Sequence, residues 1–117
     1  MKLAVVGSRT FNNYELLCGY LDRINEREPI THIVSGGAKG ADKLSERWAT
    51  EHNIETIIFI PDWEKYKKRA GFIRNQDIID TADKVLAYWD GESAGTKNSI
   101  ELAKRQHKKC HVVLFKN

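Results

Sequence analysis

Apolar residues fall into short continuous runs and longer periodic stretches that alternate along the chain. Continuous or nearly continuous apolar runs, which predict strands, occur at LAVVG (3–7), THIVSG (31–36), ETIIFIP (55–61), KVLAYWDG (84–91) and HVVLF (111–115). The first run contains no polar residue before its glycine, which is typical of a strand that is buried on both faces.

Between these runs, apolar residues recur every three or four positions and predict helices. The first helix is expected after Asn12 or Asn13, since either side chain can cap its start. Three more helices are expected at about 38–53, 71–81 and 96–107. Strands that alternate with helices indicate a mostly parallel sheet that is covered on both faces.

The expected fold class is therefore α/β, with three layers around a mostly parallel five-stranded sheet in the order 3-2-1-4-5. We expect a single domain over residues 1–117, because the sequence shows no repeat, low-complexity segment or linker. No stretch reaches the roughly 18 to 20 apolar residues that a membrane span needs. The apolar run at 3–6 is also too short for a signal peptide, so we expect a cytoplasmic protein without a membrane partner.

Charge and chemistry narrow the choice of ligand. Cys18 and Cys110 have neither a metal-binding spacing nor a disulfide framework, and the four histidines show no ligand spacing, so no metal and no cofactor is expected. The net charge of +3 is modest, and part of the excess is concentrated in Lys65–Arg69. A local excess favours a small anionic ligand at least as well as nucleic acid, which usually needs a broad basic face, and nucleic acid is not expected as a partner.

Three glycine-containing turns follow predicted strands, at 7–9 (GSR), 35–40 (SGGAKG) and 90–96 (DGESAGT). The carboxyl ends of parallel strands share one edge of the sheet, and the deepest crevice forms where the strand order reverses. We therefore expect the three turns to converge on one pocket.

The stretch VSGGAKGAD (34–42) carries three glycines and no bulky side chain before a predicted helix. A helix start offers unpaired N–H groups and the positive end of the helix dipole, and glycine lets an anion approach the backbone closely. This favours a phosphate-binding loop. Alternatively, the glycines only form a tight turn with positive φ. The spacing matches neither the dinucleotide fingerprint nor the P-loop.

Four ordered motifs carry a resemblance to a known family. GSRTF, SGGAKGAD, PDWEKYKKRAGFIRNQDII and ADKVLAYWDGESAGTKNSI resemble the SLOG superfamily, which includes DprA and the Lonely Guy enzymes, and within it the small YspA/YpsA-like branch. The similarity runs from about Lys2 to Val113. It implies a Rossmann-like fold that binds nucleotide-derived ligands, with some members hydrolysing them and others sensing them. It also implies a homo-oligomer, a dimer or higher.

Carried onto this chain, the resemblance implies a set of ligand-binding positions in the three turns and in the helix after the third strand. They are Gly7, Ser8, Arg9, Ser35, Gly36, Gly37, Gly40, Asp42, Arg74, Asn75, Asp90, Gly91, Ser93, Gly95 and Thr96. The chain departs from the family pattern where a glycine is expected near Lys67, a proline at Phe72 and a methionine near Ile78. These departures concern the connection after the third strand rather than the phosphate-binding turns.

Several of these side chains have two interpretations. Arg9 can clamp a phosphate or form a surface ion pair, and Asp42 can bond a ribose hydroxyl or favour a helix start. Arg74 can bind the ligand or pair with Asp77 at helical spacing. Thr96 can bind phosphate or cap its own helix.

Two aromatic residues, Trp63 and Tyr66, lie among the cations of Lys65–Arg69. They can cover a base by stacking, although packing is the expected role for Trp63. The basic cluster itself is either a solvated loop or a lid.

The function expected from these features is binding, sensing or sequestering of a nucleotide-derived small molecule. A first alternative is a phosphoribohydrolase or another N-glycosidic hydrolase, whose catalytic candidates are Asp42, Glu92 and Arg74. Such a reaction needs a carboxylate, but Ser99 occupies the position of the glutamate in the resembling enzymes, which counts against this alternative. A second alternative is single-stranded DNA binding after the manner of DprA.

Overall fold

The computed structural model describes residues 1–116 and places eleven elements along the chain. They are β1 (Lys2–Gly7), α1 (Tyr14–Arg27), β2 (His32–Ser35), α2 (Ala41–Glu51), β3 (Glu55–Ile58), α3 (Trp63–Tyr66), the 3-10 turn η1 (Lys67–Arg69), α4 (Ala70–Thr81), β4 (Lys84–Trp89), α5 (Ala94–Arg105) and β5 (Cys110–Leu114).

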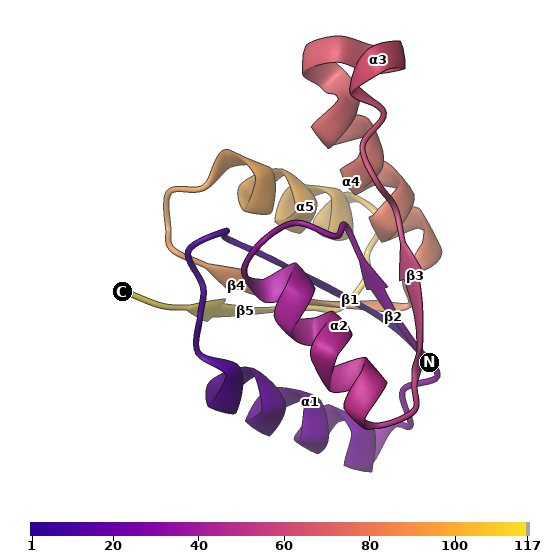
Figure 1. Cartoon of the computed structure of the whole chain (residues 1–117), viewed down its shortest axis with the longest axis vertical. Helices are drawn as coiled ribbons and strands as arrows, with labels where there is room; N and C mark the ends of the chain where they lie inside the picture. The colour runs from indigo at the N-terminus through magenta and orange to yellow at the C-terminus, as the bar shows by residue number, and fades with distance from the viewer. Residues whose placement is uncertain (117) are drawn as a thin grey trace.

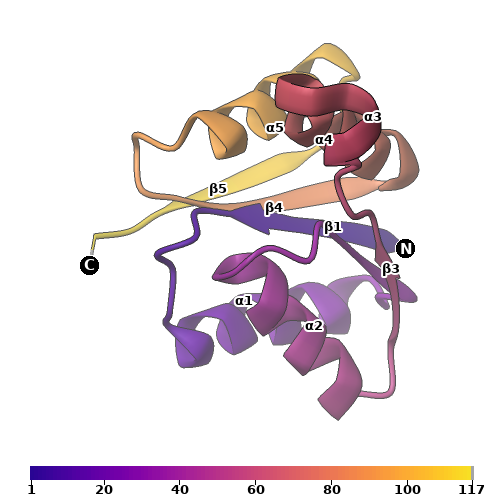
Figure 2. The same ribbon diagram turned by 45° about the horizontal axis from the view of Figure 1, so that its top comes forward.

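The strands form one parallel sheet in the order β3-β2-β1-β4-β5, which confirms the expected α/β fold and its strand order. Leu3 of β1 pairs with Ile33 of β2 on one side and with Lys84 of β4 on the other. Helices α1 and α2 cover one face of the sheet, and α4 and α5 cover the other (Figures 1 and 2). The strand order reverses between β1 and β4, so this is where a crevice is expected.

The two faces of β1 contribute to two separate apolar clusters. Leu3 and Val5 belong to the cluster that contains Trp48 of α2, whereas Ala4 and Val6 belong to the cluster that contains Ile78 of α4. Successive side chains of a strand point to opposite faces. The unbroken apolar run of β1 is therefore explained by a helical layer on each side of the sheet.

Two helices begin at other residues than expected, and hydrogen bonds of the preceding turns explain both shifts. Helix α2 begins at Ala41 rather than at about 38, because the N–H groups of Gly36 and Ala38 are held by the Asp42 carboxylate. Helix α5 begins at Ala94 rather than at 96, after a turn closed by Asp90.

The connection between β3 and α4 contains a short element that the periodicity did not predict. Helix α3 is capped by the Asp62 side chain, which accepts a hydrogen bond from the N–H of Lys65. Together with η1 it stands away from the body of the molecule (Figure 1). Lys67, where α3 meets η1, has a φ of 53° and a ψ of −129°. Any residue other than glycine has a strained backbone in this conformation.

None of the helices within the described residues has both the length and the apolar character that crossing a membrane requires.

Candidate functional site

A pocket of about 410 Å³ lies at the carboxyl ends of the central strands and receives residues from all three glycine-containing turns. It is lined by Val6, Gly7, Ser8, Arg9, Thr10, Ala38, Asp42, Arg74, Asn75, Ile78, Asp90, Ser93, Gly95, Thr96 and Ser99. We call this cavity the strand-end pocket. It lies where β1 and β4 meet, so the turns converge at the reversal of strand order.

Asp42 organises the turn between β2 and α2. Its Oδ2 accepts hydrogen bonds from the N–H groups of Gly36 (3.1 Å) and Ala38 (3.3 Å), and the residue is only 5% exposed. In the same turn, the Ser35 hydroxyl donates to Glu46 and lies away from the pocket lining. Asp42 therefore holds the glycine-rich turn in shape while it lines the pocket.

Burial changes the acidity of this carboxylate. Desolvation raises the pKa of Asp42 from 3.8 to about 6, although the hydrogen bond from Ala38, the charge of Arg74 and the hydrogen bond from Gly36 all oppose the rise. The charge of Asp42 consequently changes within a pH range that is accessible to experiment.

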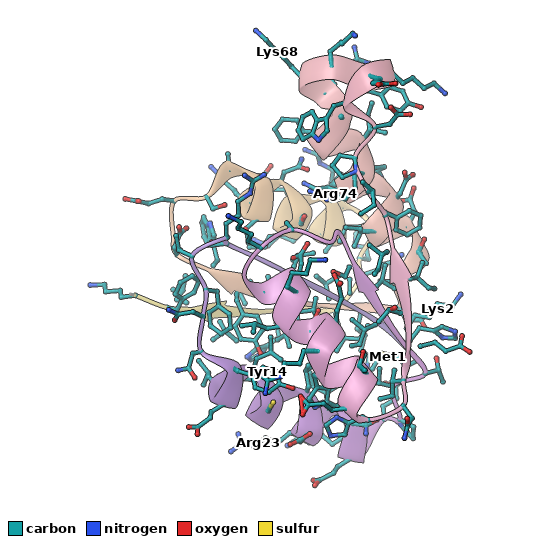
Figure 3. The ribbon with its side chains drawn as sticks, in the orientation of Figure 1. Met1, Lys2, Tyr14, Arg23, Lys68 and Arg74 are labelled. Carbon is teal, nitrogen blue, oxygen red and sulfur yellow. The ribbon has the colours of Figure 1, made fainter. Side chains whose placement is uncertain are left out.

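Arg74 reaches from α4 to the same turn (Figure 3). Its Nη1 donates to the carbonyl oxygen of Gly36 at 2.8 Å, and its Nε donates to Oδ1 of Asn75 at 3.0 Å. The alternative interpretation, an ion pair with Asp77, is not found among the described residues.

Two cationic side chains face the pocket together. Burial lowers the pKa of Arg74, the charge of Asp42 raises it, and the charge of Arg9 lowers it again. Arg9 and Arg74 both line the strand-end pocket. Two like charges at one polar cavity favour an anion between them.

The amino end of α5 forms the opposite wall. The first helical hydrogen bond runs from the N–H of Lys97 to the carbonyl of Ser93, so the N–H groups of residues 94–96 precede the helical ladder. Within the described residues, the side chain of the N-cap residue Ser93 makes no capping bond, and the Thr96 hydroxyl donates to the Ser93 hydroxyl at 3.3 Å. Thr96 is 4% exposed and does not cap its own helix. This helix end can therefore supply N–H donors and a partial positive charge to a ligand.

The turn before α5 is rigidified by its own acidic residue. Oδ1 of Asp90 accepts hydrogen bonds from the N–H groups of Ser93 (2.8 Å) and Glu92 (2.9 Å), and these bonds lower its pKa. The N–H of Asp90 in turn donates to the Ser8 hydroxyl at 3.2 Å. Asp90 and Ser8 thus fasten the first and third turns to each other.

The structure distinguishes glycines that are needed for packing from one that leaves space. A Cβ on Gly36 would lie 2.5 Å from Nη1 of Arg74, so Arg74 fills the position that a side chain would take. A Cβ on Gly95 would meet no described heavy atom within 4 Å. Only the second case has the open space that close approach of a ligand requires, whereas the first supports a contact within the protein.

The remaining predicted positions lie at varied distances from the pocket. Asn75 is 7% exposed and joins α4 to α5, because its amide donates to the carbonyl of Gly95 and to Oδ1 of Asn98. Five predicted residues do not line the strand-end pocket: they are Ser35, Gly36, Gly37, Gly40 and Gly91. Glu92, a catalytic candidate, is exposed and also lies outside this lining.

Several lining residues were not among the predicted ligand-binding positions, namely Val6, Thr10, Ala38, Ile78 and Ser99. Thr10 and Ala38 adjoin predicted residues in the glycine-containing turns, so their neighbourhood in the sequence was the available signal. Val6 and Ile78 come from a buried strand and a buried helix face, whose apolar character gives no such signal.

A second cavity of about 370 Å³ adjoins the strand-end pocket, and we call it the α3 cavity. Arg9, Ala38, Arg74, Asn75 and Gly95 line both. The α3 cavity is otherwise lined by Gly36, Gly37, Ile60, Pro61, Trp63, Lys68, Gly71 and Phe72. Trp63 is 54% exposed, so the expectation that this residue mainly packs is not met. A short α3 that stands off the body cannot bury it.

Within residues 1–116, no group of three or more His, Cys, Asp and Glu side chains is arranged to hold a metal ion.

Residues 1–66 match the family described as the YspA, cpYpsA-related SLOG family. The Gene 61 protein of Mycobacterium phage D29 is 31% identical over 111 residues, which cover 89% of each chain. The family match confirms the resemblance stated from the sequence motifs.

Two solved structures share the fold. DNA processing protein A from Helicobacter pylori, reported for its single-stranded DNA binding mode, has a TM-score of 0.77 and 22% identity, over 99% of this chain and 66% of that one. DprA from Streptococcus pneumoniae has a TM-score of 0.77 and 19% identity, over 98% of this chain and 50% of that one. The chain thus spans less than two thirds of either protein, and the likeness concerns the fold.

One expectation about partners is wrong. The modest net charge led us not to expect nucleic acid, but the fold neighbour from Helicobacter pylori is described by its binding to single-stranded DNA. Net charge was a poor guide because it averages over the surface. In this chain the cations of Lys65–Arg69 are all exposed on the segment that projects from the body.

Proposed function

The chain belongs to the YspA, cpYpsA-related SLOG family, and we propose that its strand-end pocket binds the phosphate group of a nucleotide. The observation that carries this proposal is the convergence of Arg9, Arg74 and the uncapped amino end of α5 on one cavity. A phosphate there would receive backbone N–H groups on one side and guanidinium groups on the other.

The acidic residues of the pocket do not oppose this proposal. The Asp42 and Asp90 carboxylates each accept two backbone hydrogen bonds that hold a turn together. Their charge is therefore partly compensated within the protein. The two hydrogen bonds that Arg74 donates to the protein leave further N–H donors of its guanidinium group for a ligand.

Binding without turnover is the form of this function that the site supports best. Ser99, where the resembling hydrolases carry a glutamate, is 2% exposed, and its hydroxyl donates to the carbonyl of Gly95 at 3.4 Å. A hydroxyl cannot supply the negative charge that an oxocarbenium-like centre needs. We therefore favour capture or sensing of the nucleotide over hydrolysis of its N-glycosidic bond.

A second candidate function, binding of single-stranded DNA, is favoured by one observation. The projecting segment Trp63–Arg69 combines four exposed cations with two exposed aromatic rings. Cations that follow the backbone and aromatic rings that stack on bases are the usual means of binding single strands. The phosphodiester of a strand offers the same phosphate chemistry as a free nucleotide.

Calorimetry with purified protein tests the proposal. The ligands are AMP, CMP, a thymidine dinucleotide and a 15-nucleotide single strand, each titrated into wild type and Arg9→Ala. We expect at least one of them to bind, and Arg9→Ala to weaken it by about 10- to 100-fold, as for loss of a charge-assisted bond. Arg105→Ala, which removes the same charge at the other end of α5, should bind like wild type.

Failure of every ligand to bind would contradict the proposal, as would equal losses in Arg9→Ala and Arg105→Ala. Tight binding of the 15-nucleotide strand alone, with a steep dependence on salt, would favour the second candidate function.

A further inference from the structure

We infer that the α3 cavity is a base-binding subsite, so that the ligand is a nucleotide unit with its phosphate in the strand-end pocket and its base beside α3. This inference rests on the proposed function and assigns the chemistry of the second half of the ligand.

The α3 cavity gathers large apolar side chains that the fold leaves exposed. Ile60 is 70% exposed, Trp63 is 54% exposed and Phe72 is 51% exposed, and all three line it. Single exposed apolar residues are ordinary, but several around one concave surface indicate a binding site. Ile60 follows the end of β3, Trp63 begins α3 and Phe72 lies in α4, so the three side chains meet only in the folded protein.

The α3 cavity is continuous with the strand-end pocket. Arg74 and Gly95 are among the residues that line both cavities. Arg74 lies on α4, between the glycine-rich turn and the projecting segment (Figure 3). A ligand whose phosphate is bound by Arg74 and the start of α5 can therefore extend its remaining part into the α3 cavity, which Trp63 also lines.

The chemistry of the lining matches a planar base better than an aliphatic chain. Trp63 and Phe72 offer aromatic rings, which can stack on any of the planar bases. Lys68 adds a cation to the residues that line this cavity. Gly36, Gly37 and Ala38 of the glycine-rich turn line the same cavity. Their N–H groups are bonded within the protein, so the turn can offer the edge of a base carbonyl oxygens as acceptors. A purely apolar ligand would leave these polar groups unused.

The indole ring of Trp63 lies over Gly71 of α4. A Cβ on Gly71 would lie 3.7 Å from Cη2 of Trp63, so the edge of the indole ring lies over this residue. No buried residue belongs to α3 or η1 among the described residues. The projecting segment is therefore held by few core contacts, so it can adjust to a purine or to the smaller pyrimidine.

The test compares AMP with ribose 5-phosphate, which carries the same phosphate without a base. Both are titrated into wild type, Trp63→Ala, Phe72→Ala and the matched control Tyr66→Ala. Tyr66 is an aromatic residue of the same short helix that is 36% exposed and does not line the α3 cavity.

We expect wild type to bind AMP more tightly than ribose 5-phosphate. Trp63→Ala and Phe72→Ala should each weaken AMP by about 5- to 100-fold and leave ribose 5-phosphate unchanged. Tyr66→Ala should change neither affinity. AMP should also quench tryptophan fluorescence in wild type but not in Trp63→Phe, which keeps an aromatic ring in place.

The outcomes separate the two proposals. If none of the nucleotides in this experiment and the preceding one binds, the proposed function fails. If AMP binds and Arg9→Ala weakens it, but Trp63→Ala and Phe72→Ala do not, only the base-binding subsite is refuted. The base can belong to a free nucleotide or to a DNA strand, so a dinucleotide and a 15-nucleotide strand are titrated as well. Either ligand must lose affinity in Trp63→Ala if its base binds in this subsite. Concentration-dependent dimerisation that Trp63→Ala abolishes, with AMP affinity unchanged, would also refute it.

Discussion

The guanidinium group of Arg74 lies in the space that a side chain at position 36 would need, and Gly36 leaves that space empty. The guanidinium Nη1 donates to the Gly36 carbonyl at 2.8 Å, and it lies 2.5 Å from where a Gly36 Cβ would be. Residues that are 38 positions apart in the chain thus form one wall of the strand-end pocket. The glycine provides room for the arginine, and the arginine then faces the cavity.

Gly36→Ala should therefore displace Arg74 and weaken nucleotide binding. The clash is with the movable end of a side chain, so we expect the free energy of unfolding to fall by only about 1 kcal/mol, for the hydrogen bond that Arg74 loses, together with a loss of affinity. Urea denaturation and calorimetry measure the two effects. Gly19→Ala is the control, since a Cβ there meets no described atom within 4 Å and helix α1 should gain about 0.5 to 1 kcal/mol.

Gly95→Ala should separate binding from stability. The methyl group enters open space at the start of α5, where alanine also favours the helix, so the free energy of unfolding should stay the same or rise. Nucleotide affinity should fall, because the methyl group occupies the space in front of the N–H donors. Unchanged affinity in calorimetry would show that phosphate does not approach this end of the helix.

Gly37→Val would be a poor probe of the ligand. Gly37 has a φ of +71°, and a Cβ there would lie 2.9 Å from Cδ1 of Ile60. A β-branched residue is strained in this conformation and would disturb the fold before it could report on binding. Gly95→Ala is for this reason the cleaner experiment.

Asp42 should make stability depend on pH between about 4 and 6. Its pKa is about 6 in the folded protein and 3.8 ordinarily, so the folded state binds the proton more tightly. Stability is greatest when Asp42 is protonated and falls as the pH rises through this window, by about 3 kcal/mol. Above pH 7 its contribution should be constant.

Asp42→Asn isolates this effect from the titration of other carboxylates. As the pH rises from 4 to 7, the wild type should lose stability relative to Asp42→Asn, because only the wild type has a carboxyl group that ionises at this position. Urea denaturation at several pH values measures it. A difference that does not change with pH would mean that Asp42 titrates normally.

Lys67→Gly should stabilise the protein. Lys67 has a φ of 53° and a ψ of −129°, a conformation that glycine adopts readily and other residues adopt at a cost of about 1 to 3 kcal/mol. Thermal unfolding should therefore occur at a higher temperature in the variant. Lys68→Gly, which removes the same charge from the next position, should not stabilise; a gain equal to that of Lys67→Gly would attribute the effect to charge.

Incubation of the protein with AMP should release no free adenine. Ser99 stands where the resembling enzymes carry a carboxylate, and the oxygens Oδ2 of Asp42 and Oδ1 of Asp90 are engaged by backbone N–H groups. Chromatography of the reaction mixture over several hours measures release. Efficient release that is lost in Asp42→Asn or Glu92→Gln would identify a relocated catalytic carboxylate and contradict a binding role.

The order of strands and helices and the shared edge of the three glycine-containing turns could be predicted from the sequence alone. Strand and helix periods are local properties, and parallel strands must bring their carboxyl ends to one edge. The run LAVVG already indicated a strand with a helical layer on each face. The likeness of the motifs to one family was likewise readable without coordinates.

Tertiary structure decided how individual residues are used. Gly36 and Gly95 look alike in the sequence, yet one makes room for Arg74 and the other opens onto the cavity. Tryptophan is usually a buried residue, yet Trp63 is exposed because α3 projects from the body. Phe72, which lines the same cavity, is exposed as well. Such differences depend on which distant segment fills the neighbouring space, and a local pattern carries no information about that.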